Sequence, residues 1–131
     1  MAKISPRLGK ELKAYGAVNF NACYNCGTCT AVCSLSTKEN SFPREMVRCS
    51  VTGIETDIKS SLKPWLCYYC GECTSNCPQT TNPGELMMAL RRYLMAKYDW
   101  TGITGLLFKS LTFSIIAFVL VFIGIISYAY N

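Results

Sequence analysis

The chain contains no histidine, although nine of its 131 residues are cysteine. The absence of histidine excludes zinc sites with mixed cysteine and histidine ligands. It also excludes Cys-His nucleophilic pairs, Ser-His-Asp triads and a haem ligated by a histidine of this chain. We therefore predict no catalytic residues, and we expect the cysteines to act as thiols or as sulfur ligands.

A secretory signal is also lacking, because residues 1–20 hold no apolar stretch of signal-peptide length. We therefore expect a cytosolic location for these residues, where cysteines are more often metal ligands than disulfides. The formal net charge of +5 counts every cysteine as neutral. Two bound cubane clusters, each contributing about −2, would lower it to about +1. We expect no nucleic-acid partner from this balance.

Two copies of the pattern C-x2-C-x2-C-x3-C contain eight of the nine cysteines. The first copy is Cys23, Cys26, Cys29 and Cys33, and the second is Cys67, Cys70, Cys73 and Cys77. Seven of the eleven positions are identical in the two copies, which chance enrichment in cysteine does not explain. Three closely spaced thiolates can hold three corners of a [4Fe–4S] cluster. Gly27 and Gly71 lie inside the loops, where we expect a side chain to obstruct the turn.

The fourth cysteine of such a run ligates the other cluster in two-cluster ferredoxins. On this rule Cys33 binds the cluster of the second motif, and Cys77 binds the cluster of the first. The first ligand set is Cys23, Cys26, Cys29 and Cys77. The second ligand set is Cys67, Cys70, Cys73 and Cys33. Each cluster then joins both halves of the domain, so we expect loss of the clusters to unfold it.

Three alternatives to two [4Fe–4S] clusters stay open. Two all-cysteine zinc sites favour paired C-x2-C knuckles, which lack the third cysteine at two-residue spacing. Disulfides are disfavoured without a secretory signal. A three-iron cluster in place of one cubane is also possible, although both motifs keep every cysteine.

Helix signals dominate outside the motifs, and the soluble part is predicted to be mainly α. Residues 5–15 suggest a helix with Ser5 as its cap and Pro6 in its first position. Residues 43–52 suggest a second helix, which Gly53 ends, and a short helical stretch before residue 63 follows. Asn82-Pro83-Gly84-Glu85 is typical of a helix start, and this helix is expected to reach residue 97 or 98.

The last part of the chain is an apolar segment without charge. Residues 110–130 contain no charged side chain and span about 32 Å as a helix, close to the hydrocarbon thickness of a bilayer. All 13 Lys and Arg residues precede it, which predicts a single-pass protein of the cell membrane with its N-terminal domain in the cytoplasm. We expect residues 1–102 to form the cluster domain, and residues 103–131 an interfacial lead-in and the transmembrane helix. A buried core helix is the alternative.

Several residues near the motifs allow more than one interpretation. We expect Cys49, which belongs to neither motif, to be a small buried hydrophobic residue. Four arginines are candidates for stabilising reduced clusters, for docking an acidic partner or for a solvated face: Arg44, Arg48, Arg91 and Arg92. Four aromatic residues are expected to shield the clusters from water: Tyr24, Trp65, Tyr68 and Tyr69.

With these motifs the chain resembles the C subunit of heterodisulfide reductases. It also resembles the iron–sulfur N-terminal part of the third subunit of the quinone-interacting membrane-bound oxidoreductase. The cysteine frame is similar to that of the iron–sulfur subunit of succinate dehydrogenase and fumarate reductase. Besides the two cysteine motifs, the matching segments are residues 42–44, 65–71, 83–85 and 89–93.

The resemblance implies an α-helical ferredoxin-like domain with two [4Fe–4S] clusters. It also implies electron relay between a cytoplasmic flavin or Fe–S subunit and a membrane quinone or haem subunit, as in an anaerobic respiratory complex. The chain departs from the family at Ser34, where a proline often follows the first motif. Its larger relatives have several membrane helices with haem-ligating histidines. It also lacks the CCG motifs of the heterodisulfide-cleaving subunit, so disulfide reduction is not predicted.

We therefore expect a non-catalytic electron-transfer subunit of an oxidoreductase complex, anchored in membrane lipid. The alternatives are a membrane-tethered Fe–S redox sensor, for which no output module is visible, and a structural anchor with zinc knuckles.

Overall fold

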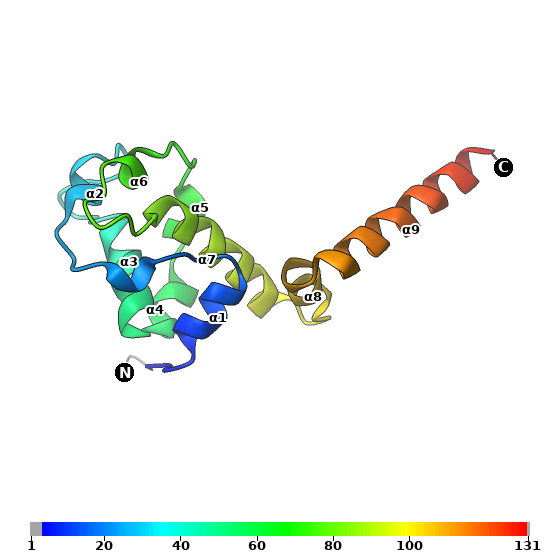
Figure 1. The fold of residues 1–131 in the computed structure, drawn as a ribbon, viewed down its shortest axis with the longest axis horizontal. Coiled ribbons are helices and arrows are strands. Elements are labelled where there is room, and N and C mark those ends of the chain that lie inside the picture. Colours follow the sequence, from blue (N-terminus) through cyan, green and yellow to red (C-terminus); the bar gives the residue numbers. More distant parts are fainter. Residues whose placement is uncertain (1–3, 131) are drawn as a thin grey trace. The chain divides into compact units, whose positions relative to one another are not determined.

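The protein is almost entirely helical in the computed structural model, which describes residues 4–130. No strand occurs within this range, and the only β contact there is an isolated bridge between Ile4 and Ile54. Figure 1 shows the helices in chain order: α1 (Leu8–Ala14), the 3-10 helix η1 (Phe20–Ala22), α2 (Thr28–Ala31), α3 (Arg44–Thr52), α4 (Glu55–Ser60), α5 (Lys63–Leu66), α6 (Glu72–Ser75), α7 (Pro83–Tyr98), α8 (Ile103–Lys109) and α9 (Leu111–Tyr130). The prediction of a mainly α chain is confirmed.

The chain forms two compact units, residues 1–94 and residues 95–131, and α7 crosses the boundary between them. The predicted functional division after residue 102 stays a prediction. In the first unit the short helices α2 and α6 pack against each other, at the end opposite α1 and α4 (Figure 1). These two helices carry cysteines of the two motifs, so the repeats meet in space.

Helix α7 supplies the largest share of the core of the first unit. Leu86, Leu90, Tyr93 and Leu94 of this helix are fully buried. Helices α1 and α3 pack against each other, and η1 packs on α3. The ring of Tyr15 meets the ring of Tyr93 edge to face, with centroids 5.9 Å apart. This ring contact joins the end of α1 to α7.

The helix ends show which local signals decide the structure. Helix α3 ends at Thr52, and Gly53 adopts a left-handed φ of 78°, as predicted for a helix-stopping glycine. Helix α1 begins at Leu8, so the prediction of Ser5 as its cap is wrong. The backbone N–H of Ser5 instead donates to the carbonyl oxygen of Gly53 at 2.8 Å, and this long-range pairing keeps the chain extended there. Added side-chain atoms at Gly53 would lie 2.8 Å from the Ser5 carbonyl oxygen.

The second unit contains α8 and α9, which pack against each other. The carboxylate of Asp99 accepts hydrogen bonds from the backbone N–H groups of Thr101 and Thr104, at 2.8 and 2.7 Å. These bonds, with one from the Thr101 hydroxyl, hold the pKa of Asp99 far below its usual range. Helix α9 has 20 residues with a mean hydropathy of 2.5 and no buried residue. It is the one helix of the described chain that is long and apolar enough to cross a membrane.

Candidate iron–sulfur site

The two cysteine motifs have the same backbone conformation. Gly27 and Gly71 occupy the same motif position and have φ values of 92° and 87°. Asn25 and Tyr69 also correspond, with φ values of 65° and 59°. In each copy the glycine precedes a four-residue helix, α2 or α6. Equal cysteine spacing therefore produces equal loops, including a left-handed conformation at Tyr69 that bulky residues rarely adopt.

The requirement for glycine in these loops is conformational. A methyl group placed on Gly71 would meet nothing within 4 Å. On Gly27 it would meet only the end of the Arg44 side chain, at 3.4 Å. A clash with neighbouring atoms is therefore not what disfavours a side chain at these positions. Only a positive φ favours glycine at both positions.

A recess with about 390 Å³ of empty space lies at the second motif. Cys67, Cys70 and Cys73 line it together with Cys33 from the first motif. Burial raises the pKa of Cys73, and negative charge on Cys67, Cys70 and Cys33 raises it further, although the Thr74 hydroxyl opposes the rise. The structure therefore gathers the four members of the second ligand set.

Two other members of the first ligand set, Cys23 and Cys26, lie near Cys29. Burial raises the pKa of Cys29 to about 11, and the charges of Cys23, Cys73 and Cys26 add to the rise. Cys77, from the second motif, interacts electrostatically with Cys26. Cys33 thus lies with the three leading cysteines of the second motif, and Cys77 lies near Cys26 of the first. Because Cys29 also interacts with Cys73, the two sets are close neighbours.

Hydrogen bonds reach several sulfur atoms of the first set. The backbone N–H of Asn25 lies 3.4 Å from Cys23 Sγ. The hydroxyl of Thr28 is 3.4 Å from Cys26 Sγ, and this contact is the largest of the effects that lower the pKa of Cys26. Burial raises the pKa of Cys77, but bonds from the hydroxyl and backbone of Thr81 and from the backbone of Gln79 outweigh it and lower the pKa.

The donor set is suited to iron–sulfur clusters. All nine cysteines are free of disulfides. Thiolates are soft ligands that select zinc, copper(I) and iron–sulfur clusters. Among residues 4–130 no group of three or more Cys, Asp or Glu side chains is close enough to hold one metal ion. Ligands of a single zinc ion all lie about 2.3 Å from it, whereas cluster ligands bind separate iron atoms and stand further apart.

Arg91 fastens the second motif to α7. Its Nε donates to the carbonyl oxygen of Pro64 at 2.7 Å, and its Nη2 donates to that of Trp65 at 3.0 Å. The guanidinium also donates to the carbonyl oxygen of Cys67. Arg91 therefore fixes the chain that enters the second motif.

The other three arginines differ in their roles. Arg44 donates from Nε to the side-chain oxygen of Asn25 at 2.7 Å and so braces the first loop. Arg92 donates to the carbonyl oxygen of Tyr15 at 2.9 Å and joins the end of α1 to α7. Arg48 is exposed. Sequence reasoning missed these bracing roles, because most of the acceptors are main-chain groups distant in sequence.

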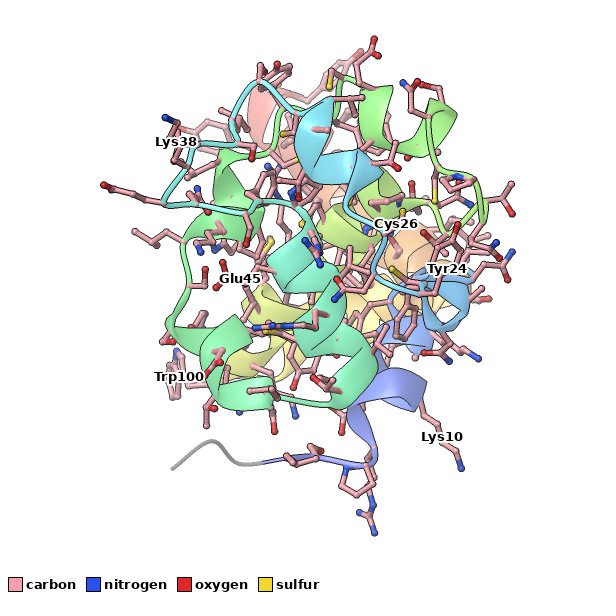
Figure 2. The ribbon with its side chains drawn as sticks, turned by 90° about the vertical axis from the view of Figure 1, so that its left-hand side faces the viewer. Lys10, Tyr24, Cys26, Lys38, Glu45 and Trp100 are labelled. Carbon is pink, nitrogen blue, oxygen red and sulfur yellow. The ribbon has the colours of Figure 1, made fainter. Side chains whose placement is uncertain are left out.

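Tyr68 and Tyr69 line the recess of the second motif, as expected of shielding residues, but all four aromatic side chains are exposed. Tyr24 and Tyr68 expose 60% and 61% of their surface, and Trp65 and Tyr69 are also exposed. Tyr24 and Cys26 both reach the surface in the side view of Figure 2. Further apolar cover at the second motif comes from residues that were not singled out: Leu35, Phe42 and Met87. The expectation for Cys49 is confirmed, since it is 1% exposed.

Comparison with known proteins agrees with this geometry. Residues 22–81 match the 4Fe-4S dicluster domain family. The matched segment is a little under half of the chain. It contains all eight motif cysteines and both short helices, and the predicted resemblance is confirmed.

A curated relative matches beyond the dicluster domain. It is a protein of Archaeoglobus profundus that is named for its likeness to the C subunit of heterodisulfide reductase, and it is 27% identical over 97 residues. The match covers 73% of this chain and 52% of the relative, so the chain spans about half the length of the relative. No solved structure matches the chain.

Proposed function

We propose that the dicluster domain holds two [4Fe–4S] clusters, one on the first ligand set and one on the second. The observation that carries this proposal is the position of Cys33, which lines one recess with Cys67, Cys70 and Cys73. The reciprocal approach of Cys77 to Cys26 supports the first set. A bound cluster supplies one-electron chemistry.

The chain's own residues would hold these clusters and keep water from them. The thiols of both sets bind as thiolates, which coordination keeps deprotonated despite the raised pKa of Cys29 and Cys73. Leu35, Phe42 and Met87 cover the second set with apolar surface. The glycine turns bring the three leading thiols of each motif to one side of a short loop.

Analysis of the full chain, purified without oxygen, tests the cluster content. We expect about eight iron and eight sulfide per chain, and a reductive titration that takes up two electrons. Zinc at one ion per motif would overturn the proposal. About seven iron would indicate one three-iron cluster instead.

We further propose that the protein is an electron-transfer subunit of a multisubunit oxidoreductase. It would relay electrons between a flavin or Fe–S subunit and a membrane subunit that binds quinone or haem. The subunit name of the Archaeoglobus profundus relative supports membership in a complex. Purification of the native complex without oxygen, followed by identification of its subunits, tests this role.

Helix α9 is proposed as the membrane anchor of this subunit. Its 20 residues span about 30 Å, which matches the apolar thickness of a bilayer. Helix α8 would lie in the interface, as its exposed Ile103 and Leu106 and the 96% exposed Trp100 before it suggest. The charge distribution supports a cytoplasmic dicluster domain, because no Lys or Arg follows Lys109.

Deletion of residues 110–131 tests the anchor. We expect the shortened chain to leave the membrane fraction. It should keep the brown colour of bound iron–sulfur clusters, because no proposed ligand follows Cys77. Loss of both clusters would instead identify α9 as part of the core. A protease site added at the C-terminus should be cut only from the non-cytoplasmic side.

A further inference from the structure

The two ligand sets are chemically identical, but two positions beside them differ. The residue two places after the second cysteine is Thr28 in the first motif and Glu72 in the second. The residue four places after the fourth cysteine is Thr37 in the first motif and Thr81 in the second. Because the fourth cysteines exchange, Thr81 lies beside the first ligand set and Thr37 beside the second.

Thr81 and Thr37 make different contacts. Thr81 is 1% exposed, and its hydroxyl lies 3.1 Å from Cys77 Sγ. A metal-bound thiolate has no proton, so in a loaded protein this hydroxyl must be the donor. Thr37 is exposed, and its hydroxyl accepts the backbone N–H of Asn40 at 3.1 Å. Within the described chain its hydroxyl makes no hydrogen bond to Cys33.

Thr28 and Glu72 differ in charge. The hydroxyl of Thr28 lies 3.4 Å from Cys26 Sγ and donates to it once the thiolate is formed. Glu72 lines the recess of the second ligand set, and an ionised carboxylate has no proton to donate. The side-chain amide of Asn76 donates to one carboxylate oxygen of Glu72 at 3.4 Å. Because an amide is neutral, this contact does not cancel the negative charge of Glu72.

Some other neighbours are matched or act in the same direction. The Arg91 guanidinium, which donates to the carbonyl oxygen of Cys67, instead places a positive charge beside the second ligand set and acts in the opposite direction. Thr30 beside Cys29 and Thr74 beside Cys73 occupy equivalent positions, and each lowers the pKa of its cysteine. They therefore do not distinguish the sets. The Arg44 guanidinium lies beside Gly27 in the first loop, because one of its nitrogen atoms is 3.4 Å from the position that a Cβ atom on Gly27 would take. Its positive charge acts in the same direction as the hydroxyls beside the first ligand set.

We propose that the cluster on Cys23, Cys26, Cys29 and Cys77 has a higher reduction potential than the cluster on Cys67, Cys70, Cys73 and Cys33, and that Thr81, Thr28 and Glu72 set this difference. Hydrogen bonds to sulfur and positive charge stabilise the reduced, more negative cluster, whereas a nearby carboxylate destabilises it. The inference rests on the proposed pair of clusters.

The consequence is an ordered uptake of electrons. A one-electron reductant such as dithionite should reduce the cluster on the first ligand set before it reduces the cluster on the second ligand set. No bond in the protein changes and no proton is required. Within the chain, an electron on the second ligand set moves spontaneously to an oxidised first ligand set.

Midpoint potentials of the full chain in detergent, measured in anaerobic titrations followed by electron paramagnetic resonance, test the assignment. Thr81→Val removes the buried hydroxyl at nearly constant volume and should lower the higher of the two potentials. Thr37→Val is the matched control and should change neither. Glu72→Thr at an exposed position should raise the lower potential, and Thr28→Glu should lower the higher one.

The result that supports the inference is that Thr81→Val and Thr28→Glu lower the same potential while Glu72→Thr raises the other. Equal potentials in the wild type, or an effect of Thr81→Val on the lower potential, would overturn it. If Thr81→Val does not fold, the variants Thr28→Glu and Glu72→Thr decide the question. An iron content that excludes two cubanes would refute the proposed function itself, whereas about eight iron with unshifted potentials refutes only this inference.

Discussion

The two cysteine motifs share one backbone and differ in what surrounds it. Their glycines have φ values within a few degrees of each other, and each starts a four-residue helix. The first loop is braced through a side chain, by the Arg44 contact with Asn25, whereas Arg91 braces the main chain that enters the second. Ligand spacing therefore determines the local loop, and the remaining chain determines how firmly each loop is held and how its sulfurs are solvated.

The largest difference between the motifs is expected on loss of their arginine braces. Arg91→Ala removes bonds to three carbonyl groups, and we expect a destabilisation of about 3 kcal/mol. The variant should lose iron from the second ligand set, about four of eight atoms. Iron analysis after purification without oxygen measures this loss.

Arg44→Ala is the matched variant in the first motif. It removes one bond to a side chain and should cost about 1 kcal/mol while the iron content stays unchanged. Equal iron loss in the two variants would contradict the difference in bracing.

A smaller and equal effect is expected from the two loop glycines. Gly27→Ala and Gly71→Ala each place a methyl group on a residue with positive φ, at a cost of about 1 kcal/mol. The rate of cluster loss in guanidinium measures the effect. A much greater loss at Gly27 would show that its contact with Arg44 cannot relax, and the two loops would then not be equivalent.

The smallest effect is expected at Tyr69, where the first motif has asparagine. The hydroxyl of Tyr69 donates to Glu85 at 2.8 Å, and this bond raises the pKa of the phenol. A raised pKa means that the folded state binds the phenol proton more tightly than the unfolded state. The stability that this hydrogen bond contributes is therefore complete below about pH 10, and it is lost as the pH rises through the pKa of Tyr69 in the folded state. The rate of cluster loss in Tyr69→Phe should slightly exceed the wild-type rate at pH 8, and the two rates should converge at strongly alkaline pH. A difference that persists there would assign the effect to packing.

The longer helices were predictable from the sequence, and the four-residue helices of the two motifs were not. Pro43 and Gly53 mark the ends of α3, and Pro83 marks the start of α7, because these residues act through their own backbone. Helices α2 and α6 have only four residues, too few for any periodic pattern. The start of α1 was misplaced because a partner nearly fifty residues away, Gly53, holds Ser5.

The ligands were predictable because their spacing is itself the signal, whereas their surroundings were not. Sequence spacing cannot show that Arg91 reaches the carbonyl of Cys67 or that Thr81 is buried against Cys77. Both contacts depend on how α7 and its preceding loop pack on the motifs. The exposure of Tyr24 and Tyr68 was missed for the same reason.

The central claim is that each cluster joins the two motifs, and cysteine alkylation in Cys33→Ala tests it most directly. The variant is purified without oxygen, treated with iodoacetamide and digested for mass spectrometry, with wild type and Cys77→Ala in parallel. Cys67, Cys70 and Cys73 should become alkylated in Cys33→Ala, while Cys23, Cys26, Cys29 and Cys77 stay protected by bound iron. Cys77→Ala should give the reverse pattern. Alkylation of Cys23, Cys26 and Cys29 in Cys33→Ala, with the second motif protected, would show that each motif holds its own cluster and would contradict the account.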